Sequence, residues 1–341
     1  MAPFLTRLSL LGVLFLPAVP FAAGTAAAND GAASIVAGGI VLEKTEAVRI
    51  AREDLFISPE RIEVAYKFEN VTEKDAELTL AFPFPDIFAD DIGSQWPDEP
   101  EQVRFIDFST TFNGAPVKAR EVVEIISLEG ENVTQLFREE GFPLAPYADL
   151  WQASTWFGDE EKTASVKARL AALGLLGNFE SRKWKTRISY VWDAVFPAGE
   201  TVAVTHSYRP VAGAFHLAFQ NPPAADDGVE AFDHWFRKQY CVSDDLFQTL
   251  AAQPVEERFT FYARETGYVL KTGANWAGPI GTFHLTVDTG APDAFFSTCW
   301  PHELTRTGPQ RLEFSATDFT PRHDLLFMTY APSDMQEGTT E

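Results

Sequence analysis

Side chains that could carry out chemistry are scattered along this chain and do not gather into a motif. No two of its six histidines share the i, i+4 spacing of a helix face or the i, i+2 spacing of a strand face: His206, His216, His234, His284, His302 and His323. The signatures H-E-x-x-H, G-x-S-x-G, C-x-x-C, G-x-G-x-x-G and the phosphate-binding loop do not occur. Adjacent acids such as Asp226 and Asp227 point apart on a strand, which does not suit the paired carboxylates of a glycoside hydrolase. The sequence therefore identifies no catalytic residue, and an enzyme is not the favoured class, although histidines can still meet across strands.

An acidic segment, residues 86–102, carries the side chains most suited to a metal ion. Carboxylate oxygens are what calcium prefers, which makes Asp86, Asp90 and Asp91 the candidate calcium ligands. The D-x-D-x-D-G spacing of a calcium loop is missing, so a solvated acidic loop is the alternative. We expect no cofactor, with calcium as the exception to be tested.

Two tryptophans are candidates for contact with a ligand. Trp96 lies within the acidic segment, and Trp276 lies in TGANWAGPIG, where it could form a platform at a loop tip. The alternative for Trp276 is a side chain that holds its loop onto a sheet.

The two cysteines, Cys241 and Cys299, predict a disulfide because the chain begins like an exported protein. Arg7 precedes an apolar run, Leu8 to Phe21, and small residues follow up to Ala28, where we expect a leader peptide to be cleaved. The apolar run is too short for a comfortable membrane span, and no cysteine near Ala28 could accept a lipid. We expect a periplasmic or secreted, soluble product without a membrane span.

The composition limits the partners of the protein. The formal net charge of -22 repels nucleic acid and anionic lipid, whereas 13% aromatic residues indicate a packed globular protein. The partner expected for such a surface is a protein or a glycan.

The segment from Glu53 to Phe84 predicts the architecture. Apolar residues alternate with polar ones from Ile62 to Phe68 and again from Leu78 to Phe82, on either side of a polar turn, which predicts a hairpin with one apolar face. Such a face needs a second apolar layer, and many later segments alternate in the same way, so we predict a mainly β fold built on a β-sandwich.

Along the chain, the leader (1–28) precedes a β-sandwich domain (29–215) with a helical insertion at about 131–178. Asn113-Gly114 predicts a hairpin turn. Within the insertion, Val166, Leu170 and Leu173 predict the buried stripe of a helix that ends at Gly174. Residues 221–228 are the candidate linker to a second, smaller β-rich region (216–341), which begins with a helical segment.

Several sequence segments of the first half resemble a family of secreted bacterial proteins known as a domain of unknown function, DUF4424. They are VAGGIVL, EDLFISPERIEVAYKFEN, AFPFPD and YVWDAVFPAGETVAVTHSYRP. The resemblance covers nearly all of the chain after the leader and implies no catalytic or ligand residues. The same segments are more weakly similar to the VIT β-sandwich of trypsin-inhibitor heavy chains, and this similarity supports the prediction of a β-sandwich. From the sequence we therefore expect an exported binding or structural module of the bacterial envelope. A carbohydrate-active enzyme or sugar-binding protein and a calcium-dependent adhesion module are the alternatives.

Overall fold

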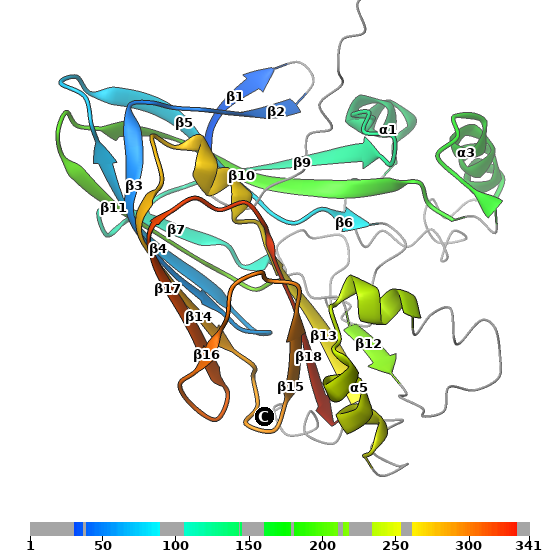
Figure 1. Cartoon of the computed structure of the whole chain (residues 1–341). Helices are drawn as coiled ribbons and strands as arrows, with labels where there is room; N and C mark the ends of the chain where they lie inside the picture. The colour runs from blue at the N-terminus through cyan, green and yellow to red at the C-terminus, as the bar shows by residue number, and fades with distance from the viewer. Residues whose placement is uncertain are drawn as a thin grey trace, which may run out of the picture.

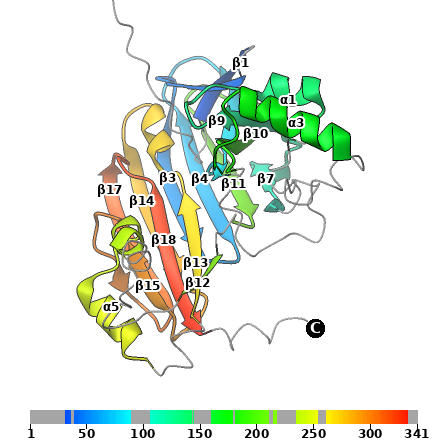
Figure 2. The same cartoon turned by 90° about the vertical axis from the view of Figure 1, so that its right-hand side faces the viewer.

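The computed structural model describes residues 31–36, 39–88, 106–142, 144, 160–178, 181–210, 214–217, 234–253 and 261–332 (Figures 1 and 2). The predicted leader, the candidate linker 221–228, Asp90, Asp91 and Trp96 lie outside these residues. The described strands form three sheets, so the mainly β expectation is confirmed.

The largest sheet has eight strands in the order β16-β17-β14-β3-β4-β11-β7-β8. Their bounds are β3 (Val48–Ile57), β4 (Ile62–Asn70), β7 (Ser109–Phe112), β8 (Ala115–Pro116), β11 (Thr201–Tyr208), β14 (Ile280–Asp288), β16 (Thr305–Arg306) and β17 (Arg311–Phe319). Neighbouring strands pair antiparallel except β3 and β14, which run parallel. This sheet crosses the boundary expected near residue 215, because β14, β16 and β17 come from the second predicted region.

Two smaller sheets face the inner side of the eight-stranded sheet, one above the other in Figure 1. The six-stranded sheet contains β1 (Gly31–Val36), β2 (Gly39–Glu43), β5 (Ala76–Pro83), β6 (Ile87–Phe88), β9 (Arg120–Ser127) and β10 (Trp184–Phe196). The four-stranded sheet contains β12 (Ala214–Leu217), β13 (Phe261–Tyr268), β15 (Phe295–Thr298) and β18 (Leu325–Pro332).

One hydrophobic core joins the three sheets. Phe68 of the eight-stranded sheet, Phe82 of the six-stranded sheet and Phe327 of the four-stranded sheet are buried in the same cluster. The hydroxyl groups of Tyr66 and Tyr268 lie 2.9 Å apart in this core and link the large sheet to the four-stranded one. The predicted second apolar layer is thus present, and it is divided between two sheets.

The predicted hairpin between residues 62–68 and 78–82 does not form. Strand β4 pairs with β3 and β11, whereas β5 pairs with β1 and β10 in the opposite sheet. Between β4 and β5, the Asn70 amide donates to the carbonyls of Lys74 and Phe196 at 2.8 and 2.7 Å, and its oxygen accepts from the Thr72 amide. These bonds hold the chain as it crosses between layers. Alternation correctly predicted the buried face of β4, whereas β5 is buried on both faces from Leu80 to Pro83, including Ala81, which was expected on the polar face. Alternation contains no information about which strand is the pairing partner.

The helical insertion is present and has a small core of its own. It contains α1 (Thr134–Glu140) and α3 (Glu160–Ala172), and Val166 and Leu170 pack with Phe137 and Trp184. Gly174 follows α3 with a φ of 72°, a conformation that favours glycine. Leu173, expected in the buried stripe, is 41% exposed, because the turn at Gly174 brings Leu175 into the core in its place.

The helical segment of the C-terminal region covers the outer side of the four-stranded sheet. A helical turn at 234–239 and helix α5 (Asp244–Ala251) bury Phe236, Phe247 and Leu250 against Met328 and Tyr330. Ser243 caps α5 by accepting a bond from the Leu246 amide at 3.1 Å. Among the described residues, no helix combines the length and the apolar character needed to cross a membrane.

Candidate functional site

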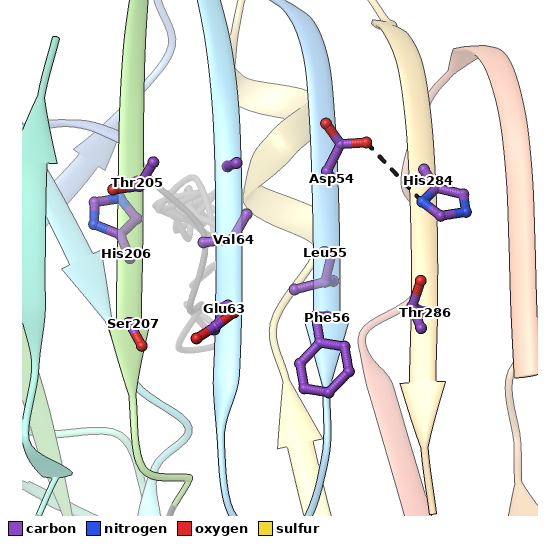
Figure 3. Close-up of a pocket in the computed structure, with 11 residues that line it drawn as sticks. Asp54, Leu55, Phe56, Glu63, Val64, Thr205, His206, Ser207, His284 and Thr286 are labelled. Carbon is purple, nitrogen blue, oxygen red and sulfur yellow. Dashed lines mark ion pairs between the residues drawn. The ribbon is translucent and has the colours of Figure 1, made fainter. Parts of the chain in front are cut away.

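The outer face of the eight-stranded sheet carries an open pocket of about 420 Å³ (Figure 3). We call it the outer-face pocket. Eight residues on that face line it: Asp54 and Phe56 of β3, Glu63 and Ala65 of β4, Thr205 and Ser207 of β11, and His284 and Thr286 of β14. Leu55, Val64 and His206 also border it, but they alternate with these residues and are buried toward the core.

Strand register places these eight side chains in two rows across the sheet. In one row, Asp54 lies opposite both His284 and Ala65, and Ala65 lies opposite Thr205. In the other, Thr286, Phe56, Glu63 and Ser207 follow one another across the four strands. Ala65, Thr205 and Ser207 are small and adjoin one another on β4 and β11, so the face is hollow there.

The carboxylates of the pocket are already paired within the protein. Arg52 donates to both Asp54 oxygens at 2.6 and 2.7 Å, and Arg61 donates to Glu63 at 2.8 Å. The hydrogen bond and the charge of Asp54 raise the pKa of Arg52. His284 Nδ1 lies 4.0 Å from Asp54 Oδ1, the pair marked in Figure 3. The charges beside the pocket therefore nearly cancel.

The hydroxyl groups of the pocket differ in what they bind. The Thr205 hydroxyl shares a 2.6 Å bond with that of Thr111. Ser207 Oγ is shielded from solvent and has no hydrogen-bond partner among the described residues. A shielded hydroxyl without a partner costs free energy.

The arrangement does not amount to a catalytic constellation. Ser207 lies three strands from His284, about 14 Å at the usual strand spacing, so this histidine cannot act as its base. Ser315 lies opposite His284, and Asp54 lies on its other side, but Ser315 is exposed and makes no hydrogen bond with His284 in the described structure. Nor does any group of three or more His, Cys, Asp or Glu side chains among the described residues suit a metal ion.

The residues singled out from the sequence lie elsewhere. Trp276 follows the 3-10 helix η3 (Lys271–Asn275), is only 4% exposed, and packs against Phe68 with ring centroids 4.6 Å apart. It therefore holds its loop onto the sheet and offers no platform to a ligand. Asp86 is engaged by Lys185 at 2.7 Å and Arg187 at 3.0 Å, and these cations would compete with calcium for its oxygens.

The predicted disulfide is confirmed: Cys241 and Cys299 are bonded, with Cα atoms 5.2 Å apart. It joins the helical segment to the end of β15. No described residue near it suggests a redox function.

The outer-face pocket was not predicted from the sequence. Alternation in β4 does place Glu63 and Ala65 opposite the core, which was the available signal. The parallel pairing of β3 with β14 joins residues more than 200 positions apart, such as Asp54 and His284, and no local pattern indicates it.

Comparison with known proteins supports the family resemblance. A family model described as "Domain of unknown function (DUF4424)" matches residues 28–328. No curated protein matches. Among solved structures, a candidate nutrient-binding protein from Legionella pneumophila aligns with 90% of this chain and 72% of its own length, at 16% identity and a TM-score of 0.43. The M1 zinc metallopeptidase of Deinococcus radiodurans aligns with 84% of this chain but only 43% of its own length, at 7% identity and a TM-score of 0.26. At these TM-scores, neither neighbour carries an argument about ligand or chemistry.

Proposed function

Since the chain belongs to the DUF4424 family, whose description assigns no activity, we propose from its own geometry that it is an exported binding module of the bacterial envelope. Its ligand is a small molecule or a terminal unit of a larger one, held in the outer-face pocket. The leader-like residues 1–28 and the disulfide support export.

The outer-face pocket is the observation that carries this proposal. Its volume of about 420 Å³ falls within the usual range for small-molecule sites, roughly 300–1,000 Å³. It brings together hydroxyl, carboxylate, imidazole and phenyl groups on four paired strands, which hold their side chains more rigidly than loops do. No described group in it is positioned to break a bond, so binding suits this geometry better than catalysis.

A ligand screen read out by thermal unfolding tests the proposal. We expect at least one class among neutral sugars, amino acids, polyamines and nucleosides to raise the melting temperature, because a ligand that binds only the folded state stabilises it. The variant Ala65→Trp fills the pocket with an indole ring and should abolish that rise.

The matched control is Ala115→Trp, since Ala115 is exposed on the edge strand β8 of the same sheet, outside the pocket. It should respond to the ligand as the wild type does. The proposal fails if no class raises the melting temperature, or if the rise persists in Ala65→Trp.

A further inference from the structure

The paired charges around the outer-face pocket favour a neutral ligand. Arg52 is committed to Asp54 and Arg61 to Glu63, with donor–acceptor distances between 2.6 and 2.8 Å. A cationic ligand could pair with a carboxylate only by displacing its arginine. An anionic ligand could pair with an arginine only by separating it from its carboxylate. An anion would also meet the net charge of -22 of the whole chain.

The polar groups that remain available suit a ligand with several hydroxyl groups. A paired carboxylate keeps free lone pairs and accepts from a ligand O–H, and the exposed Thr205 hydroxyl, although bonded to that of Thr111, has a lone pair left to accept as well. Figure 3 shows these groups on opposite sides of the hollow, with Ser207 and Thr205 on β11 and Asp54 and His284 across β3 and β14. A ligand lying between them would need polar groups around its edge.

An apolar contact lies between these polar edges. The Phe56 ring is half-buried at the pocket, and Ala65 contributes only a methyl group. A ring with hydroxyl groups around its edge and C–H bonds on its face matches this combination, since aromatic rings pack well against apolar faces.

We propose that the outer-face pocket binds a neutral carbohydrate, as a free mono- or disaccharide or as the terminal unit of an envelope glycan. This inference rests on the proposed function and specifies its ligand class. Phe56 packs against the sugar ring, while Asp54, Glu63, His284 and Thr205 bind its hydroxyl groups.

Calorimetric titration with sugars that differ in charge tests the proposal. The probes are neutral hexoses, N-acetylglucosamine and maltose, compared with cationic glucosamine and anionic glucose 6-phosphate. We expect a neutral sugar to bind, and its charged analogue to bind about tenfold or more weakly, because the charge breaks an existing ion pair.

Variants of Phe56 locate the bound sugar. Phe56→Leu should weaken binding by roughly five- to tenfold, whereas Phe56→Tyr keeps the ring face and should keep the affinity. Phe88→Leu removes an exposed ring on β6 of the six-stranded sheet and should leave binding unchanged. The melting temperature of each variant verifies that it folds.

The possible failures are distinguishable. If a charged or non-sugar probe binds in a manner sensitive to Ala65→Trp while neutral sugars do not bind, the carbohydrate assignment is wrong and the proposed function stands. If a sugar binds but Ala65→Trp and Phe56→Leu do not weaken it, the assignment to this pocket is wrong. If no probe of any class binds, both proposals fall.

Discussion

Buried and exposed side chains of β4 and β5 should differ sharply in their contribution to stability. Phe82 is fully buried, with its ring centroid 4.7 Å from that of His206 and 5.4 Å from that of Phe84. We expect Phe82→Ala to lower the free energy of unfolding by about 3–5 kcal/mol, because the change removes apolar contacts and leaves a cavity. Denaturant unfolding measures this loss.

The control changes are Glu63→Ala and Glu77→Ala, since both side chains face away from the core. Each should alter stability by less than about 0.5 kcal/mol. Losses comparable to that of Phe82→Ala would show that these faces are buried in solution.

A second residue, Glu124, makes stability depend on pH. It is 5% exposed on β9, and its Oε1 accepts from the Asn132 side chain at 2.8 Å. Burial raises the pKa of this carboxyl above its ordinary value of 4.5, against the opposing effect of Arg187. A raised pKa in the folded state means that the folded protein holds the proton more tightly, so this group's contribution to stability falls as pH rises from 4.5 through the raised value.

We therefore expect Glu124→Gln to gain stability relative to the wild type over that pH range and to keep a constant advantage above it. The difference in unfolding free energy between the two proteins, measured from pH 4 to 8, checks this. Glu129→Gln, on an exposed neighbour, should show no such trend. A difference in unfolding free energy that is independent of pH would contradict a raised pKa of Glu124.

At the scale of elements, the pairing of β3 with β14 depends on a glycine. Strand β3 is irregular between Ile50 and Arg52, and a Cβ added at Gly281 of β14 would meet the Ala51 carbonyl oxygen at 2.6 Å. That atom is backbone and cannot move away without disturbing the sheet. Gly281→Ala should cost roughly 1–3 kcal/mol, measured by denaturant unfolding.

Gly308→Ala is the matched control, because a Cβ there would meet only the Arg311 side chain at an ordinary 3.5 Å. Its effect should stay within about 0.5 kcal/mol. Equal effects of the two changes would show that β14 accommodates a side chain at position 281.

The disulfide acts on a second element, the helical segment that covers the four-stranded sheet. Cys241 and Cys299 are separated by 58 positions, and closing a loop of that size stabilises a protein by roughly 4 kcal/mol in the chain-entropy model. We expect reductant to lower the melting temperature. Hydrogen exchange should increase first around Phe236 and Leu250, whose cluster is separate from the main core.

Without reductant, the variant Cys241→Ser/Cys299→Ser should already have the lowered melting temperature of the reduced wild type. Adding reductant should not change it. If the wild type unfolds at the same temperature in both conditions, the bond contributes nothing to stability.

At the scale of the whole molecule, we expect export with removal of the leader. Small residues at Ala26 and Ala28 predict a product that begins at Asn29. Intact-mass measurement of protein from the periplasmic fraction, prepared without detergent, checks this. A product that keeps Met1, or one recovered only with membranes, would contradict it.

The sequence by itself determined which face of β4 is buried, where several turns lie and which cysteines are paired. Burial along β4 follows its alternation because a strand has only two faces and one of them must leave water. The turn at Asn113-Gly114 formed as expected, with φ angles of 49° and 79° that suit these two residue types. These features depend on residues close in sequence, or, for the disulfide, on there being a single possible pair.

Only the tertiary structure decided which strands are neighbours, and hence where the outer-face pocket lies. Alternation is the same whether β4 pairs with β5 or with β3 and β11, so it could not exclude the hairpin that is absent. Trp276 became part of the core because Phe68 and Phe196 offered it an apolar surface that no local pattern reveals. Asp54 and His284 are brought together by the parallel pairing of β3 with β14, which depends on the packing of the whole chain.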